Sequence, residues 1–159
     1  MQNIRLICVG KLKENYLREA FAEYEKRLRP FCRFQLFELP EERLPGEPSA
    51  ALIEKALELE GERILKAAEG SEIFALCIEG EPLSSETFAE KIEKNALSGE
   101  GGLSFVIGSS FGLSKTVKSA AKERISFSRM TFPHQLFRVM LLEQIYRAFQ
   151  ILNGGKYHK

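Results

Sequence analysis

The chain has 159 residues, of which 44% are hydrophobic and 28% charged, and its net charge is +1. These values are typical of one soluble globular domain and exclude a disordered protein. No apolar run approaches the roughly 20 residues that cross a bilayer, and the N-terminal apolar stretch is too short for a signal peptide. We therefore expect a single domain over residues 1–159, in the cytoplasm and without a membrane partner.

The first third of the chain predicts a strand, a helix and a second strand. Residues 3–9 form the first strand, which ends at Gly10. Apolar residues then recur at spacings of three and four over residues 13–28, which predicts a helix that Pro30 ends. Residues 33–39 alternate polar and apolar side chains and predict the second strand.

A surface loop and a helix lead from this strand to the middle of the sheet. The loop is rich in proline, from Pro40 to Pro48, and Ser49 is a suitable N-cap for a glutamate-rich helix over about residues 50–68. Residues 73–78 are uninterruptedly apolar, as in a strand buried on both faces. We expect a loop at residues 79–82.

The second half continues the alternation. A helix runs from Ser84 or Ser85 to about Asn95, residues 103–107 form a fourth strand, a fifth lies near Arg124–Phe127, and the last helix runs from Pro133 to about Leu152. Strand and helix therefore alternate along the chain. This order predicts the α/β class, with a largely parallel sheet and helices on both faces.

The last helix carries apolar residues around most of its circumference, between His134 and Leu152. A surface helix of a small monomer should keep one face polar. We therefore expect a second copy of the chain to cover part of this helix, in a homodimer.

Charge is segregated along the chain. Residues 1–33 carry eight Lys or Arg against four Glu, and residues 111–159 carry nine against two. Residues 34–110 carry six against sixteen. A basic surface built from both ends would suit a nucleic acid, although basic helix faces are often simply solvated.

The cysteines and the acidic residues exclude several kinds of site. Cys8, Cys32 and Cys77 form no CxxC pair and have no nearby histidine, so we expect small buried side chains and no metal. All acidic residues are glutamate, and without aspartate no Ser-His-Asp triad can form.

Three loops follow the predicted strands at the edge where parallel sheets bind ligands, at residues 79–82, 108–114 and 126–133. The second loop has Leu113 where a Walker A motif needs glycine, and Ser110 where a dinucleotide motif needs one. It is either a glycine-lined turn that a ligand approaches closely or a simple connection from strand to helix.

The two histidines have different surroundings. His134 follows Pro133 at the start of a helix, where the dipole disfavours an imidazolium, so a structural role is favoured. His158 lies in the ending Lys156-Tyr157-His158-Lys159. This tail is either frayed or, with its aromatic ring, imidazole and lysines, suited to stack a base and hold its phosphate.

Several segments closely resemble the ribosomal RNA large-subunit methyltransferase H family. The most specific are Ser126–Gln135 and the ending Tyr157–Lys159, and Val9–Lys13, Phe105–Gly108 and Glu143–Phe149 also match. The likeness covers the whole chain. It implies a SPOUT-class α/β domain with a trefoil knot near the C-terminus. It also implies a homodimer that methylates N3 of a pseudouridine in 23S ribosomal RNA, on assembled ribosomes, with S-adenosylmethionine.

The resemblance also implies the site residues. The catalytic residues would be Arg147, Tyr157 and His158, with His158 as the first candidate for the base that removes the N3 proton. The cofactor would be held by Leu76, Gly108, Phe127, Ser128, Arg129, Met130, Thr131 and Phe132, without a metal.

One departure from the family concerns the loop after the fourth strand. The family usually has two adjacent glycines there, whereas Gly108 is followed here by Ser109 and, before Gly112, by Phe111. We expect this bulkier loop to narrow the cofactor pocket. An alternative function is a non-catalytic RNA-binding factor for ribosome assembly that keeps the fold and has lost the cofactor.

Overall fold

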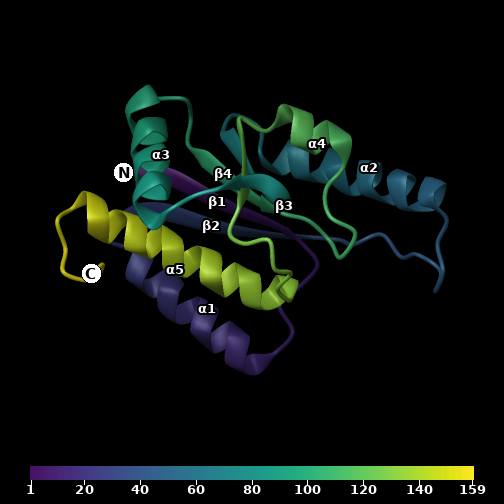
Figure 1. Cartoon of the computed structure of the whole chain (residues 1–159), viewed down its shortest axis with the longest axis horizontal. Coiled ribbons are helices and arrows are strands. Elements are labelled where there is room, and N and C mark those ends of the chain that lie inside the picture. The colour runs from purple at the N-terminus through teal and green to yellow at the C-terminus, as the bar shows by residue number, and fades with distance from the viewer.

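Five parallel strands form one sheet in the order β2-β1-β4-β3-β5 in the computed structural model, which describes residues 1–159 (Figure 1). The strands are β1 (Gln2–Val9), β2 (Cys32–Leu39), β3 (Glu72–Pro82), β4 (Leu103–Ile107) and β5 (Glu123–Ser126). The helices are α1 (Asn15–Leu28), α2 (Ala50–Ala67), α3 (Ser85–Ser98), α4 (Lys115–Ala120) and α5 (His134–Leu152). The predicted α/β class with a parallel sheet is confirmed.

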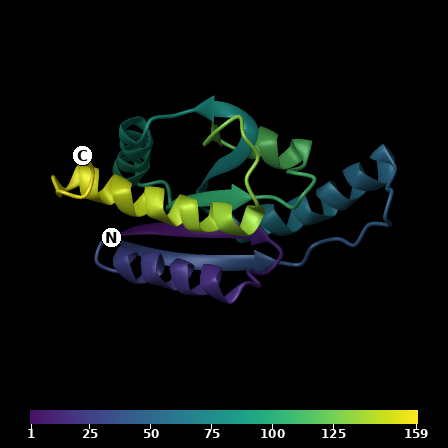
Figure 2. The same cartoon turned by 60° about the horizontal axis from the view of Figure 1, so that its bottom comes forward.

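Helices cover both faces of the sheet, as expected (Figure 2). Successive side chains of a strand point to opposite faces, so Leu6 of β1 packs with α1, α3 and α5, whereas Ile7 packs with α2 and α4. The larger core lies on the three-helix face. Its centre is Phe105, whose ring packs edge-on against Phe74 at 5.7 Å between centroids.

Strand β3 continues past the point where the sequence predicts a loop. Residues 79–82 belong to it, because both Leu76 and Glu81 pair with Ile125 of β5 and the residues between them form a bulge. Gly80 lies against β5 so closely that a Cβ atom would stand 2.7 Å from the Ile125 nitrogen. Only glycine fits there. The predicted loop was wrong because Glu81 and Pro82 pair with β5, a long-range contact that the local sequence does not show.

Two helix boundaries differ from those expected, and one helix was not predicted. α1 begins at Asn15 rather than 13, because Glu14 is extended and the Lys13 N–H donates to the Gln135 side chain at 2.8 Å. α3 continues to Ser98, where Gly99 ends it with φ of 70°. The six-residue helix α4, capped by Ser114, is too short to have been identified by periodicity.

The chain crosses the sheet after β5. The loop of residues 127–133 carries it from the edge strand over the ends of β3 and β4 to α5, where Arg138 contacts β1 (Figure 1). This path fits the trefoil knot that the resemblance implies.

The apolar circumference of α5 is covered in large part by its own chain. The helix packs on the sheet with α1 on one flank and α3 on the other (Figures 1 and 2). What these neighbours leave open is a smaller apolar strip: Leu136 is 39% exposed, and Val139 and Met140 are half-buried. The spread of apolar residues thus has an explanation within one chain.

Two of the three free cysteines are buried in the core of the protein. Cys8 and Cys32 are buried, and burial raises the pKa of each thiol to about 12, so both stay protonated. Cys77 is half-buried. No three His, Cys, Asp or Glu side chains are grouped as a metal site would need, and no helix has the length and apolarity to cross a membrane.

Candidate active site

A cleft of about 300 Å³ lies at the carboxyl ends of β3, β4 and β5. Its walls are the end of β3 from Leu76 to Glu79, the loop after β4, the loop after β5, and the start of α5 at His134. This is the edge where ligands bind in open parallel sheets. The volume is at the lower end of the range of about 300–1,000 Å³ for small-molecule sites.

Most residues expected to hold a cofactor meet in this cleft. They are Leu76, Gly108, Phe127, Ser128, Met130, Thr131 and Phe132. Arg129 is exposed and is not among the residues that line the cleft. The walls combine apolar side chains with the backbone of two loops, which suits a flat ring system joined to a polar tail.

The loop after β4 is a tight turn that leaves no room for a side chain at Gly108. A Cβ atom there would stand 2.2 Å from the Gly112 carbonyl oxygen, because the turn folds back on itself. The Ser109 carbonyl closes the turn by accepting from the Gly112 N–H at 2.9 Å. Glycine at 108 is therefore required by the turn itself.

The expected narrowing of the pocket by Ser109 does not occur. Ser109 is buried and turned away from the cleft, with its hydroxyl donating to the Glu60 carboxylate at 2.9 Å. Phe111, at the tip of the turn, does line the cleft and is 48% exposed. The bulk added to this loop thus stands at the mouth of the cleft.

The titratable groups that line the cleft each keep one protonation state at neutral pH. At the rim, Lys118 forms an ion pair with Glu79 and thereby lowers the pKa of that carboxyl. Burial, with Arg138 nearby, lowers the pKa of His134, which lines the cleft and is half-buried. His134 is therefore neutral at neutral pH, as its place at a helix N-terminus predicts.

The C-terminal tail is docked against α5 and is not frayed. The Tyr157 hydroxyl donates to Glu143 at 3.1 Å, and the Tyr157 ring packs against Tyr146 with 4.9 Å between centroids. Burial, with hydrogen bonds to Tyr24 and Glu143, raises the pKa of Tyr157 to about 12. The phenol therefore stays protonated at neutral pH.

Arg147, Tyr157 and His158 form one cluster, as expected. The Arg147 guanidinium donates to Glu143 at 3.0 Å and lies over the Tyr157 ring, 4.7 Å from its centroid. It also lies 3.1 Å from His158 Nδ1. A guanidinium can only donate, so Nδ1 accepts, and the proton sits on Nε2, which is 2.8 Å from Glu86 Oε1.

Sequence reasoning missed Glu143, the acceptor that joins this cluster. Its Oε1 accepts from both Arg147 and Tyr157. The signal was present, because Glu143 precedes Arg147 by four residues and shares its helix face. Its partnership with Tyr157, fourteen positions away, is not a local pattern.

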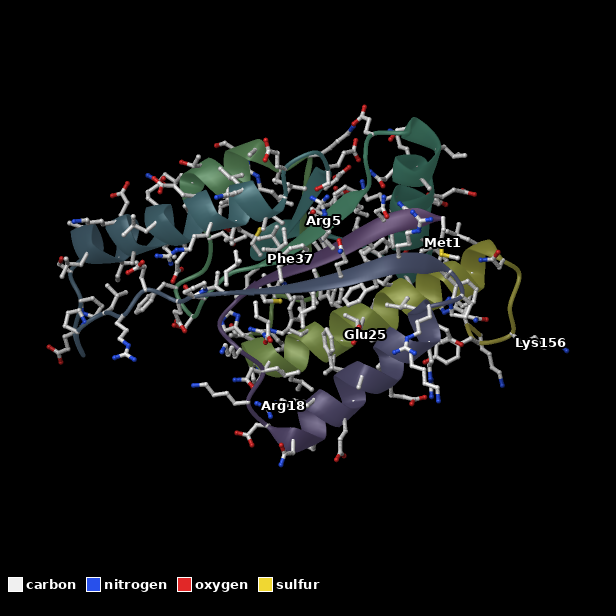
Figure 3. All side chains as sticks on the ribbon, turned by 180° about the vertical axis from the view of Figure 1, so that it is seen from behind. Met1, Arg5, Arg18, Glu25, Phe37 and Lys156 are labelled. Carbon is white, nitrogen blue, oxygen red and sulfur yellow. The ribbon has the colours of Figure 1, made fainter.

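The tail cluster and the cleft lie at opposite ends of α5. His134 at the first turn lines the cleft, and Arg147 follows thirteen residues later, which is roughly 20 Å along the helix axis. Figure 3 shows Lys156 of the tail at the end of the molecule where Met1 begins β1, away from the carboxyl ends of the strands. None of the three cluster residues lines the cleft of its own chain.

Comparison with known proteins places these features in a family. The family described as "Predicted SPOUT methyltransferase" matches residues 2–158. A protein of Ligilactobacillus salivarius named ribosomal RNA large subunit methyltransferase H is 51% identical over 99% of each chain. One of the same name from Streptococcus pneumoniae is 46% identical over 98% of this chain and 99% of the relative.

Solved structures share the fold at low sequence identity. A probable methyltransferase from Bordetella pertussis superposes with a TM-score of 0.59 at 17% identity, over 92% of this chain and 95% of the other. A probable methylase family protein from Haemophilus influenzae gives 0.56 at 13% identity, over 99% of this chain and 71% of the other. At these identities the likeness shows a shared fold.

Removal of an aromatic side chain from the wall of the cleft should weaken cofactor binding. Phe132→Ala removes a half-buried ring from the wall, and we expect calorimetry to show S-adenosylmethionine bound roughly tenfold or more weakly, because apolar contact area is lost. Phe34→Ala, on β2 outside the cleft, is the control and should keep the affinity. Equal affinity in the Phe132 variant and the unmutated protein would place the cofactor elsewhere.

Proposed function

Because the chain belongs to the ribosomal RNA large subunit methyltransferase H family of SPOUT methyltransferases, we propose that it methylates N3 of a pseudouridine in 23S ribosomal RNA. Its methyl donor is S-adenosylmethionine. We further propose that residues 1–159 act as one domain, as a homodimer, on assembled ribosomes in the cytoplasm. The observation that carries the proposal is the cleft at the strand ends, where the expected cofactor residues meet.

The residues of the cleft fit this donor. Its apolar walls, among them Leu76 and Phe127, suit an adenine ring, and the loop backbones at Gly108 and Thr131 suit the polar groups of an amino-acid tail. When bound, S-adenosylmethionine supplies a methyl group on a sulfonium, which needs no further activation. The protein's task is to align the acceptor with this group and to exclude water, which can contribute roughly 7–11 kcal/mol.

The roles in the tail cluster follow from its protonation states. Arg147 stays cationic because its contact with Glu143 raises the pKa of the guanidinium, so it suits a phosphate or a base edge. Tyr157, protonated, can donate a hydrogen bond or stack. His158 is left as the residue to take the N3 proton.

His158 needs a rearrangement before it can act as a base. Its Nδ1 lone pair faces Arg147 and its Nε2 proton faces Glu86, so neither nitrogen is free in this arrangement. We propose that Arg147 turns to an RNA phosphate when the substrate binds. That movement would free Nδ1 of His158 for the proton.

A homodimer would bring the two halves of the site together. One chain holds Arg147 roughly 20 Å along α5 from the His134 end of its own cleft. The apolar strip formed by the exposed Leu136 and the half-buried Val139 and Met140 offers a surface for a second copy. We propose that the tail of one copy faces the cleft of the other. The alternative of a non-catalytic RNA-binding factor gains no support from the cleft, which retains its walls.

The reaction itself is tested on ribosomes that lack the modification. We expect the protein with radiolabelled S-adenosylmethionine to label large-subunit RNA, and nucleoside analysis of the digest to identify N3-methylpseudouridine. Label in a different nucleoside would contradict the proposed substrate. Binding of the donor without any transfer would favour the assembly-factor alternative.

The tail is tested by removing single groups. His158→Ala should lower the single-turnover rate by about 10²–10⁴-fold with ribosome affinity kept, because a base acts only in the transition state. Arg147→Ala should instead weaken ribosome binding in a salt-dependent way. Lys55→Ala, an exposed lysine on α2 outside the tail, is the control. A His158 variant with reduced affinity and a normal rate would make this residue a binding group.

The shared site is tested by complementation. Phe132→Ala damages the cleft and Arg147→Ala damages the tail cluster, so each homodimer should be nearly inactive. Co-expressed as a mixed dimer, the two should regain activity, because one pairing of cleft and tail is intact. Light scattering should report about twice 18.1 kDa for the unmutated protein. Mixed dimers as inactive as their parents would mean that each chain supplies its whole site.

A further inference from the structure

The carboxylate that accepts from Ser109 is buried, and it does not line the cleft. Glu60 on α2 is 3% exposed, and burial raises the pKa of its carboxyl above the ordinary value. Arg63, one turn further along α2, is engaged with Glu42. A buried charge of this kind is costly unless hydrogen bonds compensate it.

Both oxygens of Glu60 accept hydrogen bonds from other parts of the chain. Oε1 accepts from the Ser109 hydroxyl at 2.9 Å, and Oε2 accepts from the Glu42 N–H at 2.9 Å. The carboxylate therefore joins α2 to the turn after β4 and to the loop after β2. Both contacts span many positions in sequence, so they hold tertiary structure together.

The turn after β4 forms a wall of the cleft, and Ser109 anchors it from behind. The residues of this turn that line the cleft are Gly108, Ser110, Phe111, Gly112 and Leu113. Ser109 is the member of the run that points away, toward Glu60. Its hydroxyl fixes the beginning of the turn to α2 while its carbonyl closes the turn on Gly112.

The next residue of α2 holds the other end of the same turn. A Cβ atom on Gly61 would stand 2.6 Å from the Ser114 hydroxyl oxygen, so α2 and the start of α4 are in close contact there. Ser114 in turn caps α4 by accepting from the Val117 N–H at 3.1 Å. Two consecutive positions of α2 thus contact both ends of the 109–114 segment.

We propose that Glu60 is a positioning residue for S-adenosylmethionine, acting through Ser109 to hold the turn of residues 109–113 in its binding conformation. The proposal rests on the proposed function, because it assigns the cleft to that donor. A turn that is ordered before binding loses less conformational entropy when the ligand arrives. Glu60 would therefore strengthen binding without touching the ligand.

The test compares variants that break the contact with one that preserves it. Ser109→Ala and Glu60→Ala should each raise the Kd for S-adenosylmethionine, measured by calorimetry, about tenfold. Glu60→Gln should keep the Kd within about twofold, because its amide can donate to the Ser109 hydroxyl and its carbonyl can accept from Glu42. The double variant, with alanine at both positions, should bind no more weakly than either single variant, because each single variant already removes the same hydrogen bond between Ser109 and Glu60.

Glu60→Gln should also raise thermal stability, and the gain should depend on pH. At pH 7.5 the charge is removed and the melting temperature should rise by about 2–4 °C. The pKa of Glu60 is higher in the folded protein than in the unfolded chain. The charge of Glu60 therefore does not destabilise the protein below the pKa of the unfolded chain, and it does so increasingly as the pH rises through the pKa of the folded protein. The gain in melting temperature should therefore vanish toward pH 4. Two charged groups face Glu60: Glu41 raises the pKa of its carboxyl, and Arg63 lowers it.

The matched control is Glu58→Ala on the same helix. Glu58 accepts from Thr116 of α4 at 3.0 Å, so this variant removes a contact between α2 and α4 and leaves the turn alone. Its Kd for S-adenosylmethionine should be unchanged. A raised Kd in this control would overturn the proposal, because any loss of packing by α2 would then suffice.

Amide hydrogen exchange supplies a readout that does not need the cofactor. Residues 109–113 should exchange faster in Ser109→Ala and Glu60→Ala and at the normal rate in Glu60→Gln and Glu58→Ala. Normal exchange and a normal Kd in Ser109→Ala would overturn the role of Glu60. Failure of the unmutated protein to bind S-adenosylmethionine would instead contradict the proposed function, and exchange would still decide the contact.

Discussion

The arrangement of the site depends on one buried guanidinium. Arg138 of α5 is 2% exposed and donates to the Glu38 carboxylate at 3.0 Å and to the Val9 and Gly10 carbonyls at 3.3 and 3.0 Å. All three acceptors lie at the carboxyl ends of β1 and β2. The start of α5 is thereby fixed to the far side of the sheet from β5, and the loop of residues 127–133 is held at both ends. Removing one partner would strand a buried charge, which typically costs about 3–5 kcal/mol.

Beyond Arg138, α5 separates the cleft at its first turn from the tail cluster near its C-terminal end. Its first turn borders the cleft, and its third and fourth turns carry Glu143 and Arg147, against which the C-terminal tail is docked. The sheet and the flanking helices α1 and α3 pack against this helix. In the proposed function, binding of the donor and contact with the RNA are assigned to separate surfaces of one chain, and a second chain would bring them together.

Sequence patterns predicted the sheet because its strands show local patterns: residues 73–78 are an apolar run, and residues 33–39 alternate polar and apolar side chains. Neither pattern requires knowledge of distant partners. They also predicted that the loops of residues 108–114 and 126–133 meet, since parallel strands bring their carboxyl ends to one edge. They missed what long-range pairing decides: the bulge of β3 depends on Ile125, and the direction of Ser109 depends on Glu60. The roles of Arg147, Tyr157 and His158 came from family resemblance, because a basic aromatic tail fits a frayed end equally well.

The contact between Arg138 and Gly10 joins residues 128 positions apart, and the cleft it supports is completed by segments from the last quarter of the chain. Contacts of such long sequence separation form slowly, because a large loop must close before they contribute. During synthesis, β1 and β2 emerge early, yet the helix that fixes their ends emerges last. The cleft therefore cannot assemble until α5 has been synthesised, because the contacts that fix the end of β1 come from this helix.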